Sequence, residues 1–213
     1  MRPAVHILVL AAGASSRMRG RDKLLQRVRG KPLLRMVADV ALATGAPVYV
    51  TLPPASDARR MTIADSAARI VDVPDAALGM SRSVARALSA VSAGAPGAED
   101  GVMILPADMP GFSSKALADL ISRFRAEPDL IWRGGTTDGA PGHPSIFPRD
   151  LWDELQAVTG DEGGLFDRNA HFFGGEHHRV TDVLQLIHWR DREITALDGR
   201  TMALVAALVL GVG

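Results

Sequence analysis

The start of the chain joins a short apolar run to a loop of small and basic residues, and this pairing limits the fold more than any other feature. The run Val5–Leu10 predicts a buried β-strand, because it is apolar at every position but one. A glycine, two serines, Arg17 and Lys23 follow within eleven positions. Small residues let a backbone approach phosphates, loop N–H groups bind their oxygens, and fixed cations neutralise them. We therefore expect a triphosphate-binding turn, which would consist of Gly13, Ala14, Ser15 and Ser16.

This loop differs from the two most familiar phosphate-binding motifs. It lacks the Gly-x-x-x-x-Gly-Lys-Ser/Thr pattern of P-loop proteins and the Gly-x-Gly-x-x-Gly pattern of dinucleotide-binding folds. An ordinary strand-to-helix turn is the alternative interpretation. The close spacing of Arg17 and Lys23 to the small residues favours phosphate binding.

Lys23 stands out because lysine is scarce. Lys23, Lys31 and Lys115 are the three lysines among 24 basic residues. A compact, mobile ammonium suits a phosphate that moves during a reaction better than a planar guanidinium does. Lys23 is therefore a candidate catalytic residue, together with Arg17.

The composition of the 213-residue chain narrows the possible classes of protein. Its 24 basic and 24 acidic residues give a formal net charge of zero, which argues against nucleic acid or a membrane as a partner. The absence of cysteine excludes disulfides, thiol nucleophiles and cysteine-ligated metals. We expect no signal peptide and no transmembrane helix, so the predicted location is the cytoplasm. The apolar segment 202–212 predicts a buried terminal helix or a dimer contact, and we expect a monomer or a weak dimer.

Apolar runs alternate with segments of helical periodicity along most of the chain. This order predicts an α/β fold in which a mostly parallel sheet carries helices on both faces. We expect one domain over 1–213, with a nucleotide-binding half at about 1–110 and an acceptor-binding half at about 111–200. The predicted strands are 5–10, 47–52, 69–73, 102–105 and 130–133, and the predicted helices are 32–44, 57–67, 81–93, 113–126 and 149–158.

A second polar group follows the predicted strand 102–105. Asp108 lies between Pro106 and Pro110, and parallel sheets bind ligands beyond the carboxyl ends of their strands. An exposed carboxylate at that edge suits Mg²⁺, which takes one or two protein carboxylates together with phosphate oxygens. A helix cap is the alternative role for Asp108, but Ser113 is the better N-cap for the helix that follows.

Three further segments contain candidate binding residues. Gly79, Ser81 and Ser83 precede or begin a predicted helix and would contact a base or ribose, with helix capping as the alternative. The rigid turn 139–144 leads to 145–147, which is similar to an edge strand, and would shape an acceptor pocket or form a plain turn. The acidic loop 160–164 would bring Asp161 to the acceptor or to the metal, with a helix cap as the alternative. The candidate acceptor-binding residues are Gly142, His143, Pro144 and Asp161.

At these residues the chain resembles the MobA-like nucleotidyltransferases, and within them the molybdenum cofactor cytidylyltransferase branch. The matching motifs cover roughly residues 5–165 and occur in the family's order. They are Leu10–Met18 with Lys23–Leu25, Gly79–Ser81, Leu105–Pro110, Gly142–Pro144 and Gly160–Gly163.

The resemblance implies a Rossmann-like, three-layer α/β/α nucleotidyltransferase fold, a nucleoside triphosphate, Mg²⁺ and release of pyrophosphate. It implies that Asp108 binds the metal, and that Ala12 marks the cytidylyl branch, since the guanylyl branch tends to carry glycine there. Relatives also carry an acid near the C-terminus that contributes to the metal site, and Asp198 is the nearest candidate here. The implied nucleotide-binding residues are Leu10, Ala11, Ala12, Gly13, Ala14, Ser15, Ser16, Arg17, Lys23, Gly79, Ser81 and Ser83.

The expected function is thus an Mg²⁺-dependent transfer of CMP from CTP to a phosphorylated acceptor such as molybdopterin, with a molybdoenzyme as a further partner. A sugar-phosphate or polyol-phosphate nucleotidyltransferase would have the same first half. A non-catalytic protein that binds or inserts the molybdenum cofactor is another alternative. A nicotinamide-dependent oxidoreductase is a third, which the missing Gly-x-Gly-x-x-Gly pattern disfavours.

Overall fold

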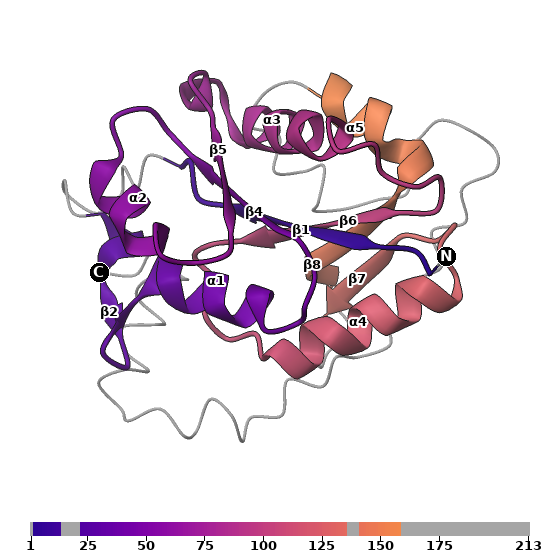
Figure 1. Ribbon diagram of the computed structural model, residues 1–213, viewed down its shortest axis with the longest axis horizontal. Helices are drawn as coiled ribbons and strands as arrows, with labels where there is room; N and C mark the ends of the chain where they lie inside the picture. The colour runs from indigo at the N-terminus through magenta and orange to yellow at the C-terminus, as the bar shows by residue number, and fades with distance from the viewer. Residues whose placement is uncertain (1, 14–21, 136–140, 159–213) are drawn as a thin grey trace.

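A six-stranded sheet with helices on both faces forms the centre of the protein (Figure 1). The computed structural model describes residues 2–13, 22–135 and 141–158. The strands are β1 Val5–Leu10, β2 Arg27–Val28, β3 Lys31–Pro32, β4 Val48–Leu52, β5 Arg69–Asp72, β6 Gly101–Pro106, β7 Trp132–Gly135 and β8 Pro141–Pro148. The α-helices are α1 Leu33–Leu42, α2 Asp57–Ile63, α3 Met80–Ser92, α4 Ser114–Ala126 and α5 Trp152–Ala157. Single 3-10 turns occur at η2 Lys23–Leu25, η3 Ala76–Leu78 and η4 Arg149–Leu151.

The sheet is mostly parallel, in the strand order β5-β4-β1-β6-β8-β7. β1 pairs in parallel with β4 on one side and with β6 on the other, and β4 pairs in parallel with β5. β8 runs antiparallel to both β6 and β7. β2 and β3 form a separate two-stranded ribbon that the sequence reading did not predict. The predicted α/β class, with its mostly parallel sheet between helical layers, is confirmed.

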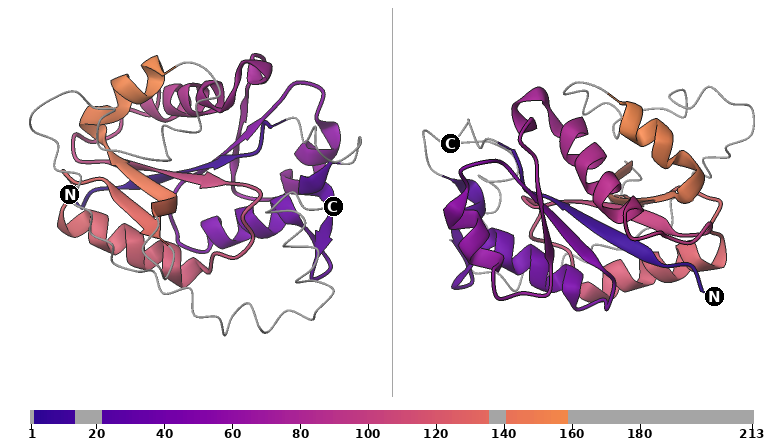
Figure 2. Two further views of the ribbon diagram at one scale, coloured as in Figure 1. Left: turned by 180° about the vertical axis from the view of Figure 1, so that it is seen from behind. Right: turned by 45° about the horizontal axis from the view of Figure 1, so that its top comes forward.

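Two apolar clusters fill the space between the sheet and its helices. One face of the sheet packs against α1 and α4, and the opposite face packs against α3 and α5. The two views of Figure 2 show these helix pairs on opposite sides of the strands. Alternation along β1 explains the division, because Ile7 and Val9 belong to the first cluster and Leu8 to the second.

The prediction that 145–147 resembles an edge strand is wrong. These residues lie in β8, which is inside the sheet between β6 and β7. Ile146 packs in the cluster on the α1/α4 face, while Phe147 packs in the cluster on the α3/α5 face. Consecutive side chains of a strand point to opposite faces of the sheet. Because both of these side chains are apolar, the strand is stable where helices shield both faces from water, as they do inside the sheet.

The residues at the helix ends have conformations and contacts that are typical of caps. The Ser113 hydroxyl accepts a hydrogen bond from the Ala116 N–H at 3.1 Å and so caps α4 as predicted. Gly45 has a φ of +75° just after α1, as expected for a residue that ends a helix. Pro32 is the N-cap of α1 and lies just outside its first turn. None of the helices in the described part of the chain is long and apolar enough to cross a membrane.

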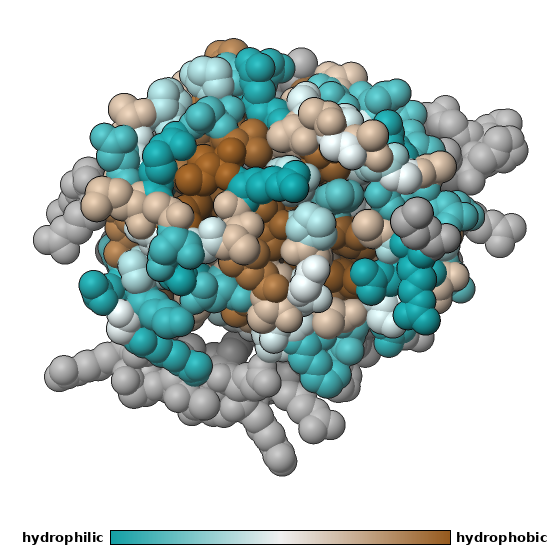
Figure 3. Space-filling model, in the orientation of Figure 1, coloured by the Kyte–Doolittle hydropathy of each residue, from teal (hydrophilic) through white to brown (hydrophobic). Residues whose placement is uncertain are grey.

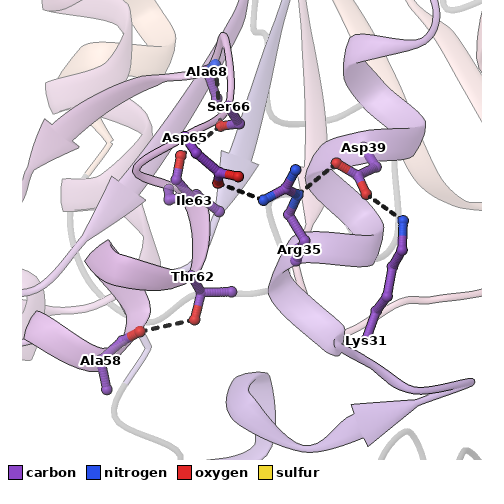
Figure 4. A network of polar contacts seen from close by, with 9 residues as sticks. All are labelled: Lys31, Arg35, Asp39, Ala58, Thr62, Ile63, Asp65, Ser66 and Ala68. Carbon is purple, nitrogen blue, oxygen red and sulfur yellow. Dashed lines mark hydrogen bonds and ion pairs between the residues drawn. The ribbon is translucent and has the colours of Figure 1, made fainter.

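An ion-pair network fixes α2 against α1 (Figure 4). The Arg35 guanidinium donates to Asp39 within α1 at 2.7 Å and to Asp65, just after α2, at 2.6 Å. Lys31 donates to the second Asp39 oxygen at 3.0 Å. Lys31 and Asp65 are exposed and Arg35 and Asp39 are partly exposed, so each pair contributes little stability alone. The contact between Arg35 and Asp65 connects α1 with the chain just after α2.

Apolar surface is visible over the β5 edge of the sheet in Figure 3. Ile70 and Val71 are only partly buried there, and among the described strands β5 pairs with β4 alone. The strand is short, and the charged residues Arg69 and Asp72 occupy its two ends. Short length and terminal charges are common ways of protecting an edge strand from pairing with another chain.

A buried histidine lies at the amino end of β1, far along the strand from its carboxyl end. His6 Nε2 is 3.5 Å from Asp100 Oδ2, and its ring packs near Tyr49 and Trp152. Burial disfavours the charged ring and holds the pKa of His6 below 6.5, although Asp100 opposes that shift. Between that lowered pKa and 6.5, the unfolded chain binds more protons than the folded one at this position.

We expect the protein to lose stability as the pH falls below about 6.5, because protonation of His6 favours unfolding. Thermal unfolding between pH 5 and pH 8 measures the effect. The variant His6→Gln keeps a polar side chain beside Asp100 and cannot titrate, so its Tm should decline less over the same range. A parallel decline in both proteins would show that other groups cause the pH dependence.

Candidate active site

The carboxyl ends of β1 and β6 lie side by side and form the edge at which the candidate site lies. Leu10 and Pro106 are paired at the last position of the two strands. The Ala107 N–H then donates to the Leu10 carbonyl at 3.1 Å, which keeps the two chain segments together beyond the ladder. The two loops that the sequence singled out therefore leave the sheet from neighbouring points.

Lys23 and Asp108 meet at this edge. Lys23 Nζ donates to Asp108 Oδ2 at 2.5 Å, although the residues are 85 positions apart. Their side chains keep 26% and 35% of their surface exposed, so the pair lies at the surface of the site and can reach a ligand. An adjacent ammonium and carboxylate can bind an anionic group and a cation together. The structure thus unites two residues that the sequence predicted separately.

The start of the loop is held by contacts from neighbouring elements. The Ala11 N–H donates to the Thr51 hydroxyl at 3.1 Å, and the Ala11 carbonyl accepts from Arg59 at 2.6 Å. Ala11 and Ala12 are buried. Gly13 is exposed, and a Cβ added to it would meet no atom of the described residues within 4 Å. Ala11 therefore contributes a buried backbone position that is held by neighbouring elements, while the missing side chain of Gly13 leaves room for a ligand.

The amino end of α3 contains the next group of candidates. Gly79 has a φ of +112° and is the N-cap residue of α3, without a side-chain cap. Ser81 is 6% exposed, and its hydroxyl has no hydrogen-bond partner among the described residues. Ser83 is also buried. The capping role weighed for Ser81 does not occur in this helix, so capping does not account for its buried hydroxyl.

Two arginines in the first half of α3, Arg82 and Arg86, contact the same carboxylate. Arg82 Nε donates to Asp75 at 2.7 Å, and Arg86 donates to the same carboxylate at 3.2 Å. Hydrogen bonds to the carboxylate lower the pKa of Asp75 to about 2, and the bond from Arg86 contributes more to this shift than the bond from Arg82. Asp75 therefore stays ionised and orients both guanidinium groups at physiological pH.

The candidate acceptor segment lies at the same edge of the sheet as Asp108. In the antiparallel pairing of β6 with β8, Ile104 is opposite Ser145, so the preceding residues of β8 approach the carboxyl end of β6. The His143–Pro144 peptide bond is cis. A Cβ at Gly134 on β7 would lie 2.5 Å from the His143 carbonyl oxygen, so β7 and β8 pack closely there. The register thus brings Gly142–Pro144 toward the side of the site that contains Asp108.

Several predicted residues fall outside the described ranges. These are Ala14, Ser15, Ser16 and Arg17 of the loop, the acids Asp161 and Asp198, and the segment 202–212. Within 2–13, 22–135 and 141–158 there is no cluster of three or more acidic, histidine or cysteine side chains that could hold a metal. Asp108 is the predicted metal ligand that the structure describes, and one carboxylate suits a cation whose other ligands are water and phosphate.

Sequence reasoning missed three residues that shape the site. Thr51 and Arg59 contact the beginning of the loop, and Asp22 caps the η2 turn that carries Lys23. Asp22 could have been noticed, because it directly precedes Lys23 and an aspartate is a favoured N-cap. Thr51 and Arg59 lie 40 and 48 positions beyond Ala11 and belong to no motif, so the sequence carried no signal for them.

A parallel sheet with polar groups gathered at its carboxyl edge is typical of α/β proteins that bind nucleotides. Comparison with protein families identifies the class further. The family model described as the MobA-like NTP transferase domain matches residues 7–179. The chain therefore belongs to the MobA-like NTP transferase family, and it has the nucleotidyltransferase fold.

Solved structures agree with this assignment. An Rv0371c homologue from Mycobacterium sp. strain JC1 is 32% identical with a TM-score of 0.65, over 78% of this chain and 80% of that one. Rv0371c from Mycobacterium tuberculosis H37Rv, crystallised with manganese, is 24% identical with a TM-score of 0.58, over 78% and 81%. A nucleotidyl transferase from Methanothermobacter thermautotrophicus is 20% identical with a TM-score of 0.61, over 76% and 80%. No curated protein matches the chain.

Proposed function

We propose that this nucleotidyltransferase moves CMP from CTP to a phosphorylated acceptor of the molybdopterin type and releases pyrophosphate. The observation that carries the proposal is the contact of Lys23 Nζ with Asp108 Oδ2 at 2.5 Å, at the carboxyl edge of the sheet. A cation and a carboxylate at one strand edge supply what a triphosphate and its metal require.

The proposed reaction is an in-line displacement at the α-phosphorus. An oxygen of the acceptor phosphate forms a bond to the α-phosphorus, the bond to the bridging α–β oxygen breaks, and pyrophosphate leaves. A phosphate monoester is already anionic near pH 7, so no general base is needed. The protein contributes by positioning the reactants and by neutralising the charge that develops.

Each part of the site has a proposed task. Lys23 neutralises charge on the α-phosphate or on the departing pyrophosphate, while Arg17 and the loop N–H groups of Gly13–Ser16 hold the β- and γ-phosphates. Ser81 and Ser83 face the base or ribose. The proposal for Ser81 is supported by its buried hydroxyl, which has no hydrogen-bond partner in the part of the chain that the structure describes. The acceptor would bind along Gly142, His143, Pro144 and Asp161.

We propose Mg²⁺ as the metal, with Asp108 and Asp198 as its protein ligands. The bound metal would supply stabilisation of negative charge on phosphate oxygens. Asp108 fits this role because a lone, partly exposed carboxylate leaves most of the coordination sphere to water and phosphate. The manganese complex of Rv0371c supports the use of a divalent cation in related structures. These proposed roles agree with a single domain in which one half binds the nucleotide and the other half binds the acceptor.

The identity of residue 12 bears on the choice of base. Ala12 is buried, and the guanylyl branch of the family tends to carry glycine at this position. We expect Ala12→Gly to raise the ratio of kcat/KM for GTP to that for CTP by about tenfold, which is the usual effect of one carbon group in a pocket. Parallel assays with both nucleotides measure the ratio. An unchanged ratio would remove Ala12 as the support for CTP.

The decisive experiment measures pyrophosphate release with CTP, GTP, ATP and UTP in turn. Each nucleotide is offered molybdopterin and a set of sugar and polyol phosphates, with and without Mg²⁺. Release with CTP and molybdopterin would support the proposal. Release with a sugar or polyol phosphate would favour that alternative, while molybdopterin binding without any release would favour a cofactor-binding protein.

A further inference from the structure

A buried arginine outside every motif joins the two ends of the phosphate-binding loop. Arg59, on α2, has a side chain that is 6% exposed. Its Nε donates to Asp22 Oδ2 at 2.5 Å and its Nη2 to Asp22 Oδ1 at 3.0 Å. Its Nη1 donates to the carbonyls of Ala11 at 2.6 Å and Gly13 at 2.9 Å. The rigid fork of a guanidinium makes such a set of directed bonds possible, and an ammonium could not reproduce it.

These partners lie on opposite sides of the loop in the sequence. Ala11 and Gly13 lie where the chain leaves β1, and Asp22 lies where the chain enters η2. One guanidinium therefore fixes the separation of the two ends. It also sets peptide orientation, because a carbonyl held toward Arg59 turns the N–H of the same planar peptide unit away from it. For the Ala11 carbonyl that N–H belongs to Ala12, which directly precedes the predicted triphosphate-binding turn.

The contacts continue from Arg59 to the candidate catalytic pair. The Asp22 carboxylate that Arg59 holds also accepts a hydrogen bond from the Leu24 N–H at 3.0 Å and so caps η2. Lys23 is the first residue of η2 and reaches Asp108 at 2.5 Å. The position of the Lys23 ammonium thus depends on a turn whose cap is fixed by Arg59.

The charge balance argues that Arg59 positions other groups and does not bind phosphate itself. Asp22 neutralises the guanidinium through two hydrogen bonds, and the Ala11 and Gly13 carbonyls accept from it as well. A charge that is almost wholly buried needs such partners. The helix that carries Arg59 is itself fixed, because Arg35 of α1 pairs with Asp65 just after α2 (Figure 4).

We propose that Arg59 is a positioning residue that sets the ends of the phosphate loop and, through Asp22, places Lys23 against Asp108. The predicted effect on catalysis rests on the proposed function, whereas the placement of Lys23 does not. The test therefore measures the accessibility of Lys23 first and the activity of the enzyme second.

Chemical labelling of lysine gives the first reading, because the chain has three lysines. Acetylation by a succinimidyl ester is followed by mass spectrometry at Lys23, with Lys115, whose side chain is 83% exposed, as the internal reference. We expect the labelling rate of Lys23 relative to Lys115 to rise roughly three- to tenfold in Arg59→Ala and in Asp22→Asn, as a pair of charge-assisted bonds is lost. Asparagine keeps an oxygen that can cap Leu24, so Asp22→Asn remains informative if Arg59→Ala fails to fold.

The neighbouring residue supplies the matched control. Arg60 lies on the same helix, pairs with Asp72 and is more exposed. The variant Arg60→Ala should leave the relative labelling of Lys23 and the kinetics of the enzyme unchanged. If folded Asp22→Asn labels Lys23 no faster than the wild type, the proposal is overturned.

Activity gives the second reading. A residue that positions Lys23 for the transition state should lower kcat more than it changes KM for the nucleotide, and Arg59→Lys should recover only part of the loss. Equal Tm and unchanged kcat in folded Asp22→Asn would overturn the catalytic part of the proposal. Absence of pyrophosphate release from the wild type would overturn the proposed function instead, and the labelling result would still decide the placement of Lys23.

Discussion

Replacing Lys23 with alanine is expected to lower kcat by about 10²–10³-fold with the fold intact, which is the usual effect of removing one preorganised charge from a reaction centre. Lys23 Nζ lies at the carboxyl edge of the sheet, 2.5 Å from Asp108 and close in sequence to the loop backbone. Its ammonium would therefore lie where negative charge grows as pyrophosphate leaves. Steady-state pyrophosphate release measures kcat, and circular dichroism with thermal unfolding tests the fold.

Lys115 offers the control for this substitution. Its side chain is exposed and pairs with Asp119 on the surface of α4, so Lys115→Ala removes the same charge from the protein without touching the site. We expect its kcat to stay within about twofold of the wild type, because an exposed ion pair contributes little. Wild-type turnover in Lys23→Ala would contradict the role assigned to Lys23.

The parts of the fold that could be predicted from sequence are those encoded locally. β1 was predicted with its observed bounds because an apolar run next to a glycine-containing loop needs no distant information. The cap at Ser113 is likewise decided by neighbouring backbone groups. Lys23 and Asp108 were predicted as site residues for the same reason, since each follows a recognisable strand; the structure brings their side chains into contact, and their roles stay predictions.

The parts that could not be predicted depend on contacts between distant segments. The place of β8 inside the sheet is decided by which strands pair, and Ile146 and Phe147 alone do not reveal their neighbours. The burial of Arg59 in the site depends on where α2 packs, 37 positions beyond Asp22. In isolation, an arginine on a short polar helix reads as an ordinary surface residue, as its neighbour Arg60 does.

Asp108→Asn is expected to lower kcat/KM by about 10²–10³-fold, because it removes the carboxylate from a reaction centre while keeping the shape of the side chain. Asp108 has two proposed tasks, to hold a divalent metal and to pair with Lys23. If the two residues act as a unit, the double variant Lys23→Ala, Asp108→Asn should lose little more activity than the weaker single variant. Losses that multiply would show that the two residues act independently.

Metal binding separates the two tasks of Asp108. Mn²⁺ affinity, measured by paramagnetic resonance with a nucleotide triphosphate present, should fall in Asp108→Asn. The same affinity should rise in Lys23→Ala, because the ammonium 2.5 Å from the Asp108 oxygen competes with a cation for that carboxylate. Lys23→Ala would then be a variant that binds metal more tightly and yet turns over slowly. Tighter Mn²⁺ binding together with slower turnover is the result expected of a lysine that acts on the phosphates. Weaker Mn²⁺ binding in both variants would instead mean that Lys23 holds the nucleotide on which metal binding depends.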